Sequence, residues 1–347
     1  MPRYREAILK KLMLWIVVLL VLCVAAGAAY NAVSVWLLMK QYPVPGKFYQ
    51  VNGVSMHLYC TGAGSPTVVL ETGLGNDWIG WQKVQPELSK TTHVCSYDRA
   101  GIGWSDSRPG LRDSKNIAAE LHALLQQAGE TGPFVLVGAS SGGLHVREFT
   151  ATYPAEIAGL VFVDGSSPEQ IEVLPGAKYS DANAKRLHRQ VTWAWIKEAF
   201  GWARLTGHCK GGVGSGLEAY ADLERANDCR PSRETGSLAE WDYFWRAAEE
   251  VAHVSCCGDL PILVISQDPD RPKAGMSAQV IANQPIWNGL QENLKRLSPH
   301  SRRIIARGSR HPVMIDRPDV VISGTQRLIM EIRNKTTDPE EGTTVVQ

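Results

Sequence analysis

The sequence has almost no net charge and no long run of charge of either sign. Its 36 Lys and Arg residues are nearly balanced by 35 Asp and Glu residues among 347 in total. Nucleic-acid-binding surfaces need clustered positive charge, which no stretch of this chain supplies. No repeat period and no heptad pattern is visible either. We therefore expect a globular protein of one large or two small domains that does not bind nucleic acid.

Several motifs of metal and nucleotide chemistry are also absent. The chain has no C-x-x-C, no H-E-x-x-H and no G-x-x-x-x-G-K-[ST] motif. The glycine-rich stretch 207–216 has its lysine on the wrong side of the glycines for a phosphate loop. The segment "HVSCC" at 253–257 contains metal-ligand types, but such lone clusters more often serve packing or a disulfide. The sequence predicts neither a cofactor nor a metal ion.

One long apolar run stands apart from the rest of the chain. Residues 12–39 carry no charge and follow a short cationic stretch, 1–11. A membrane span needs about 20 apolar residues, and the positive-inside rule keeps the cationic side in the cytoplasm. We expect a signal anchor that holds the remaining chain on the non-cytoplasmic side of a membrane. The alternatives are a secreted protein cleaved near "AAGAAY" (25–30), or a buried core helix.

The expected non-cytoplasmic location bears on the cysteines, because disulfides form in oxidising compartments. Cys60 and Cys95 lie in apolar, strand-like sequence, where we expect them to be small core residues. Cys209 and Cys229 lie in polar, loop-like sequence, where an oxidising compartment permits a disulfide. The predicted pair is therefore Cys209–Cys229.

Strand-like and helix-like segments alternate through most of the remaining sequence. Apolar strands separated by helices predict an α/β fold with a mostly parallel sheet and helices on both faces. The pattern covers 46–166 and 259–335 and stops between them, at 167–258, where helix-like segments hold five tryptophans. We expect this stretch to be a helical cap inserted between two strands. The polar tail 336–347 is expected to be disordered.

A serine-containing turn follows one of these strands. In "FVLVGASSGGLHVREF" the motif G-x-S-x-G covers 138–142, between an apolar strand and a helix, with Ser140 at its centre. A strained strand-to-helix turn needs small residues two positions before and after the serine. Ser141 also has small residues at those offsets, but the glycines favour Ser140. The motif predicts a nucleophile elbow.

A nucleophilic serine needs a base and a carboxylate that orients it. In this architecture the order along the chain is serine, acid, histidine. His311 follows the strand "RRIIARGS" and is the expected base. The preferred acid is Asp270, after the strand "LPILVIS", with Asp268 in the same loop and Asp164 as alternatives.

The negative oxygen formed during acyl transfer needs backbone N–H donors. One is expected after the nucleophile, at Ser141, and the other in the loop after an earlier strand. There "LETGLGND" contains Gly73, which lets the chain turn, and the N–H of Leu74 is the second expected donor.

With "GASSGG", "SYDRAGIGWSD" and "GSRHPVMIDRPD", the sequence resembles the α/β-hydrolase fold family, in its branch with a cap between the sixth and seventh strands. The resemblance covers 46–335 and implies Ser140, Asp270 and His311 as a catalytic triad. Two departures are Thr72-Gly73, where the family often has His-Gly, and Ala139, where a larger residue is common. We interpret Asp98 and Arg99 of the second motif as an ion pair that supports a turn.

These features together predict a membrane-anchored serine hydrolase, and the preferred activity is that of a carboxylesterase acting on a small apolar ester. A serine at the elbow argues against the relatives that use aspartate there, the epoxide hydrolases and haloalkane dehalogenases. The alternatives are an aminopeptidase or amidase of the same fold, or a hydrolase-like receptor that binds a ligand without turnover. Some of the cap tryptophans are expected either to line an apolar pocket above Ser140 or to fix the cap to the sheet.

Overall fold

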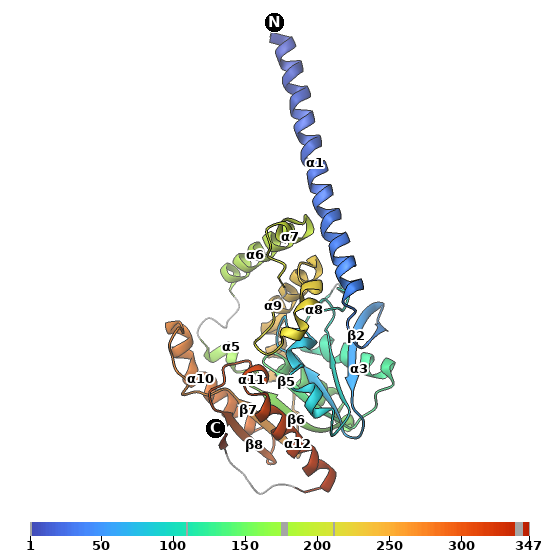
Figure 1. Ribbon diagram of the computed structural model, residues 1–347. Coiled ribbons are helices and arrows are strands. Elements are labelled where there is room, and N and C mark those ends of the chain that lie inside the picture. Colours follow the sequence, from blue (N-terminus) through green and yellow to red (C-terminus); the bar gives the residue numbers. More distant parts are fainter. Residues whose placement is uncertain (1, 109, 175–179, 211, 337–342, 347) are drawn as a thin grey trace.

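A computed structural model describes residues 2–108, 110–174, 180–210, 212–336 and 343–346 (Figure 1). Its centre is one sheet in the order β1-β2-β4-β3-β5-β6-β7-β8-β9. The strands are β1 (Lys47–Val51), β2 (Val54–Thr61), β3 (Thr67–Glu71), β4 (Val94–Tyr97), β5 (Phe134–Ala139), β6 (Ile157–Val163), β7 (Ile262–Ser266), β8 (Ser301–Ala306) and β9 (Thr343–Val346).

The sheet is antiparallel at one edge and parallel across the rest. β1 and β2 form a hairpin whose turn is Asn52-Gly53, both with positive φ, as Asn-Gly hairpins require. From β4 to β9 every neighbouring pair is parallel. The central strands β3 and β5 are buried along their whole length, because helices cover both faces. The predicted α/β class and mostly parallel sheet are confirmed.

Helices pack on the two faces of the sheet and build two apolar cores. One core includes residues of α3 (Ser114–Ala128), α4 (Gly142–Thr152) and α10 (Ala278–Lys295). The other includes residues of α2 (Gln85–Leu88), α11 (Val313–Asp316) and α12 (Pro318–Asn334). The parallel strands therefore all end at one edge between the layers, where α/β sheets place their ligands.

Where it is described, the chain between β6 and β7 contains helices and connecting loops. It contains α5 (Gln170–Val173), α6 (Asp181–Ala199), α7 (Trp202–Leu205), α8 (Ala221–Asn227) and α9 (Pro231–Ala252). α9 joins this insertion to the core, since Ala247, Ala248 and Val251 pack against Leu144 of α4. α6 packs in turn on α9 and lies further from the sheet (Figure 1).

The N-terminal helix α1 (Pro2–Gln41) projects far beyond the remaining molecule (Figure 1). It is long and apolar enough to cross a membrane, and the most apolar part of it has no buried residue. The end of α1 nearest the sheet packs against α6 and α8 of the insertion.

Three disulfides are present among the described cysteines. The predicted bridge Cys209–Cys229 is one of them. Cys60 and Cys95 were expected to be separate core residues, but they form a second bridge, because they are direct partners in the antiparallel pair β2–β4. The third joins the neighbours Cys256 and Cys257 of the "HVSCC" segment.

The C-terminal tail also differs from its prediction. Residues 343–346 form β9, which pairs with the edge strand β8. A polar, threonine- and valine-containing segment can add to a sheet edge through its backbone hydrogen bonds alone. The expected disorder of 336–347 is therefore wrong for these four residues, while 337–342 and 347 lie outside the described part.

Candidate active site

The turn between β5 and α4 has the geometry of a nucleophile elbow. Ser140 sits at its apex with a φ of +50°, a conformation that non-glycine residues rarely adopt. A Cβ on Gly138 would come within 2.7 Å of the backbone of Gly142, and one on Gly142 within 2.8 Å of Glu71 and Thr72. The two glycines are thus required by close backbone contacts, and the turn presents the Ser140 side chain at the strand ends.

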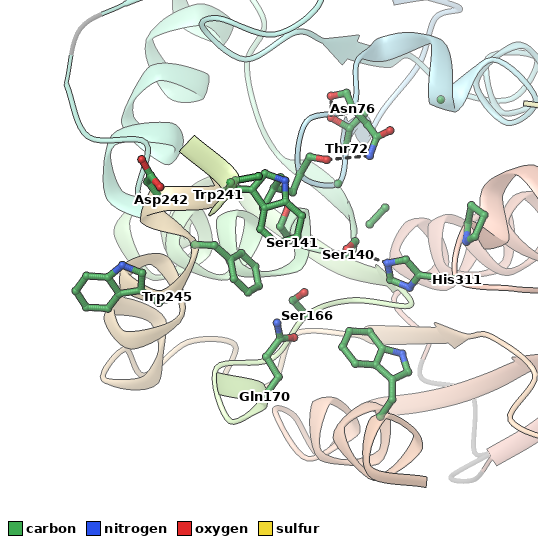
Figure 2. A pocket seen from close by; sticks show the side chains of 18 of the residues that line it. Thr72, Asn76, Ser140, Ser141, Ser166, Gln170, Trp241, Asp242, Trp245 and His311 are labelled. Atoms are coloured by element: carbon green, nitrogen blue, oxygen red, sulfur yellow. Dashed lines mark hydrogen bonds between the residues drawn. The ribbon is translucent and has the colours of Figure 1, made fainter. Parts of the chain in front are cut away.

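His311 lies opposite Ser140, in the loop between β8 and α11. Its Nε2 is 2.9 Å from Oγ of Ser140, and Figure 2 shows the two side chains facing each other. A hydroxyl at this distance can donate its proton to a neutral imidazole. The structure therefore brings together the two residues predicted as nucleophile and base.

The carboxylate on the other side of His311 is Asp164, at the end of β6. Nδ1 of His311 donates to Oδ2 of Asp164 at 2.6 Å. Asp164 is fully buried and also accepts hydrogen bonds from the indole N–H of Trp287 (3.0 Å) and the backbone N–H of Gln267 (3.0 Å). These three hydrogen bonds fix the carboxylate in place against the imidazole.

The preferred acid of the sequence analysis, Asp270, does not reach His311. Its side chain is 73% exposed and forms an ion pair with Arg307 at 3.0 Å. Asp268 is buried, but it accepts hydrogen bonds from the N–H of Gly308 and from Arg307. Arg307 thus engages both carboxylates of this loop, and the preference for Asp270 is corrected in favour of Asp164.

The pKa of His311 reflects these contacts. Burial by itself lowers the pKa, but the hydrogen bond to Asp164 and the negative charge of that carboxylate more than offset it. The pKa of His311 is therefore raised above its usual value of 6.5. A raised pKa makes the imidazole a stronger base, and it protonates at a higher pH than a free histidine.

The loop after β3 contains Leu74, whose N–H is the second donor expected from the sequence. Arg99 donates to the carbonyl oxygens of Thr72 (3.0 Å) and Gly73 (2.8 Å) from behind the loop. In a trans peptide the N–H points away from the carbonyl, so the N–H of Leu74 is directed to the opposite side, toward the pocket. Leu74 and Ser141 both line that pocket, and neither N–H donates to a described residue. Both predicted donors thus lie at the pocket, and their role in binding a negative oxygen stays a prediction.

Arg99 belongs to a buried ionic cluster that the sequence analysis missed. It contacts Glu71 of β3 at 2.5 Å and Glu240 of α9 at 2.6 Å. Glu240 also accepts from the N–H of Gly75 in the loop after β3. Burial raises the pKa of Glu71, although the charge of Arg99 opposes that shift. Glu240 thus links the insertion to Arg99, 141 positions earlier, and to Gly75 of the loop, 165 positions earlier, which no local sequence pattern reveals.

The expected ion pair between Asp98 and Arg99 does not form. Asp98 instead accepts from the backbone N–H groups of Trp78 and Trp104 and contacts Nδ1 of His57 at 2.9 Å. Consecutive residues at the end of a strand point in different directions, so the two side chains serve different partners.

A pocket of about 850 Å³ opens above Ser140 and His311. Trp241 and Trp245 of α9 line it together with Trp287 and Leu187 (Figure 2). Its size falls within the usual range for small-molecule sites. Of the five insertion tryptophans, the two on α9 line the pocket, whereas Trp193, Trp195 and Trp202 do not.

Comparison with known proteins shows the family. The sequence profile of the alpha/beta hydrolase fold matches residues 66–194. An "AB hydrolase superfamily protein" of Gibberella zeae is 32% identical over 289 residues, which cover 77% of this chain and 87% of that protein. The chain belongs to the α/β-hydrolase fold family, and the fold supports a hydrolase.

Other relatives and structures agree with this assignment. A "probable transporter" of Hormonema carpetanum is 34% identical over 78% of this chain, and the match covers 40% of that protein. The chain spans about a third to two fifths of the length of several curated relatives that it matches. Among solved structures, a thermophilic esterase from Thermogutta terrifontis is similar with a TM-score of 0.55 and 19% identity, over 83% of this chain and 99% of that one. At this identity the likeness concerns the fold.

Proposed function

We propose that the protein is a membrane-anchored serine hydrolase that cleaves carboxylic esters through an acyl-enzyme. The observation that carries this proposal is the hydrogen-bonded chain from Ser140 through His311 to Asp164 at the floor of the pocket. Serine hydrolases of acyl groups use this arrangement of nucleophile, base and orienting carboxylate. The two N–H groups beside Ser140 add the second requirement, a site for the negative oxygen.

In the first half of the reaction Ser140 Oγ attacks the ester carbonyl carbon while Nε2 of His311 takes the hydroxyl proton. Asp164 holds the imidazole by its Nδ1–H and stabilises the imidazolium that forms. The carbonyl oxygen becomes negative and accepts from the N–H groups of Leu74 and Ser141. The tetrahedral intermediate then collapses, the C–O bond to the alcohol breaks, and His311 returns its proton to the leaving alkoxide.

In the second half water replaces the alcohol. His311 takes a proton from water, and the resulting hydroxide attacks the acyl group on Ser140. The bond to Oγ breaks, Oγ regains the proton from His311, and the carboxylic acid leaves. The reaction uses the side chains of Ser140, His311 and Asp164 and the two backbone donors.

The lining of the pocket favours a substrate with an apolar acyl or alcohol group. Aromatic and aliphatic side chains line the space above the nucleophile, including Trp241, Phe244, Trp245 and Met314. An apolar wall excludes water and strengthens the contacts to the negative oxygen.

The proposed anchoring rests on α1, which is uncharged from Leu12 to Met39 and carries its cationic residues mostly before that run, within 1–11. This arrangement favours a single span with the hydrolase on the non-cytoplasmic side. The disulfides of the remaining chain suit an oxidising compartment.

The decisive experiment combines active-site labelling with turnover. A fluorophosphonate probe should label the full-length protein at Ser140, and p-nitrophenyl esters of rising chain length should be hydrolysed. Ser140→Ala should abolish labelling and lower kcat by up to about a million-fold. The matched control is Ser141→Ala, whose buried hydroxyl has no hydrogen-bond partner and whose N–H is retained, so its activity should remain close to wild type.

The possible failures are distinct. Labelling of Ser140 without ester turnover would favour an amidase or a binding protein of the same fold. Loss of activity in Ser141→Ala but not in Ser140→Ala would place the nucleophile one residue later.

A further inference from the structure

The outer end of the insertion exposes a group of large apolar side chains. We call it the tip patch, which consists of Trp193 (58% exposed), Trp195 (38%), Phe200 (38%), Trp202 (59%) and Leu205 (65%), all on α6 and α7 or the turn between them. Soluble surfaces rarely gather so much apolar area without a partner. Three of the five are tryptophans, which are enriched at membrane–water interfaces.

The tip patch is joined directly to α1. Asn31 of α1 is buried, donates to the carbonyl of Cys229 (3.1 Å) and accepts from Arg204 of α7 (3.0 Å). Gly27 lies so close to the turn between α6 and α7 that a Cβ on it would be 2.2 Å from the carbonyl oxygen of Phe200. A Cβ on Gly201 would likewise be 2.4 Å from the carbonyl oxygen of Gly27. Small residues on both sides thus allow backbone contact.

These contacts fix how deep the tip patch would lie if α1 spans a membrane. Lys11 is the last charged residue before the apolar run, and Gly27 follows 16 positions later. At about 1.5 Å per residue this distance is about 24 Å along the helix. The hydrocarbon core is about 30 Å thick, so Gly27 lies about 6 Å inside its far boundary. The turn that touches Gly27 must lie at the same depth.

Figure 1 agrees with this placement, since α6 and α7 lie beside α1 at the level from which its N-terminal part projects. Residues 4–26 of α1 are exposed, and burial begins at Gly27. The charges near the tip patch also suit a lipid surface, because 181–210 contain six Lys or Arg residues and two acids. Long basic side chains can extend to headgroups while their stems lie along apolar surface.

The helix that carries the tip patch also lines the pocket. Ala184, Leu187 and Gln190 of α6 border the space above Ser140, whereas Trp193 and Trp195 follow on the same helix, one to two turns nearer α1. We propose that the tip patch inserts into the interface of the bilayer that holds α1, and that the pocket takes lipophilic esters dissolved in that bilayer. This inference rests on the proposed ester hydrolysis and on the anchoring by α1.

Photo-cross-linking of the full chain tests the contact. The protein is reconstituted into phosphatidylcholine vesicles, with and without phosphatidylglycerol, that contain a lipid with a diazirine in its acyl chain. After illumination, mass spectrometry should find lipid adducts within 193–205 as well as within α1. Adducts confined to α1 would overturn the inference, and adducts in neither segment would overturn the anchoring as well.

Turnover tests the route to the pocket. The double variant Trp193→Gln/Trp202→Gln changes two exposed side chains and should leave the fold intact. We expect it to lower the ratio of kcat/KM for a vesicle-borne long-chain ester to kcat/KM for soluble p-nitrophenyl acetate by about tenfold. The matched control is Val280→Gln/Met330→Gln, which changes two exposed apolar residues on α10 and α12 and should keep the wild-type ratio.

The two proposals fail in different ways. An unchanged ratio in the tip variant would overturn the membrane route while leaving ester hydrolysis in place. Tip adducts in a wild-type protein that hydrolyses no ester would overturn the proposed function while the membrane contact stands.

Discussion

The strand ends beneath the pocket, which carry the proposed chemistry, and the tip patch, which carries the proposed membrane contact, differ in what their side chains contact. At the strand ends Asp164 is buried and receives three hydrogen bonds, and Arg99 is enclosed by two carboxylates. At the tip patch, tryptophans such as Trp202 are more than half exposed. Catalysis needs polar groups held in a fixed geometry. Contact with a fluid bilayer needs exposed apolar area, which packs against no particular partner.

The same difference determines how each region should respond to mutation. Removing one polar group at the strand ends breaks a geometry that many contacts hold in place. Changing one side chain of the tip patch removes only its share of the apolar area. The following experiments test this contrast, from the largest expected effect to the smallest.

Asp164→Asn should lower kcat for a p-nitrophenyl ester by about 10⁴-fold, because an amide cannot hold the imidazole in the required tautomer or stabilise its charged form. Asp270→Asn is the matched control, since this exposed carboxylate contacts Arg307 and not His311. Its activity should stay within about twofold of wild type. The reverse order of the two variants would restore Asp270 as the acid.

The pH profile should report the titration of His311. The base must be neutral to accept the proton of Ser140, so kcat/KM should fall about tenfold per unit below the pKa. Because Asp164 raises this pKa, the acid limb should lie above pH 6.5. The Asp164→Asn variant lacks the charge that raises the pKa of His311, so the acid limb of its residual kcat/KM should move to lower pH. If that limb stays at the same pH, a group other than His311 titrates there.

Trp241→Ala should change which esters are preferred. Trp241 lines the pocket, and each buried methylene of an acyl chain contributes about 0.8 kcal/mol, or about fourfold in kcat/KM. The truncation should shift the optimum chain length on detergent-solubilised protein, with circular dichroism unchanged. Phe48→Ala, on an exposed side chain of β1, is the control and should keep the optimum. An unchanged optimum in Trp241→Ala would mean that this residue serves packing only.

Cys209→Ser should act on the insertion and leave the chemistry alone. The bridge to Cys229 closes a 20-residue separation, and its loss should cost about 2–4 kcal/mol of unfolding free energy. Urea unfolding measures this loss, while kcat for p-nitrophenyl acetate should stay at wild type. Mass mapping without reductant should link Cys209 to Cys229 in the wild-type protein, and free thiols there would contradict the bridge.

Local features of this protein follow from the sequence alone. The elbow could be read from Gly138, Ser140 and Gly142, because a chain this tightly bent leaves no room for a Cβ on either side. The hairpin at Asn52-Gly53 and the apolar helix α1 follow in the same way from backbone preference and hydropathy. Such features depend on residues close together in the chain, which the sequence displays side by side.

The orienting carboxylate depended on the tertiary structure. Asp164, Asp268 and Asp270 all follow apolar strands and reach the same edge of the sheet, so their sequence surroundings are alike. Arg307 engages the two carboxylates after β7, while Trp287 and Gln267 hold Asp164 toward His311. The cluster of Arg99 with Glu240 and the contact of Gly27 with the α6–α7 turn were likewise decided only by folding. A hydrogen bond or a close backbone approach between distant segments is set by where the helices and loops pack, and the order of residues along the chain does not encode it locally.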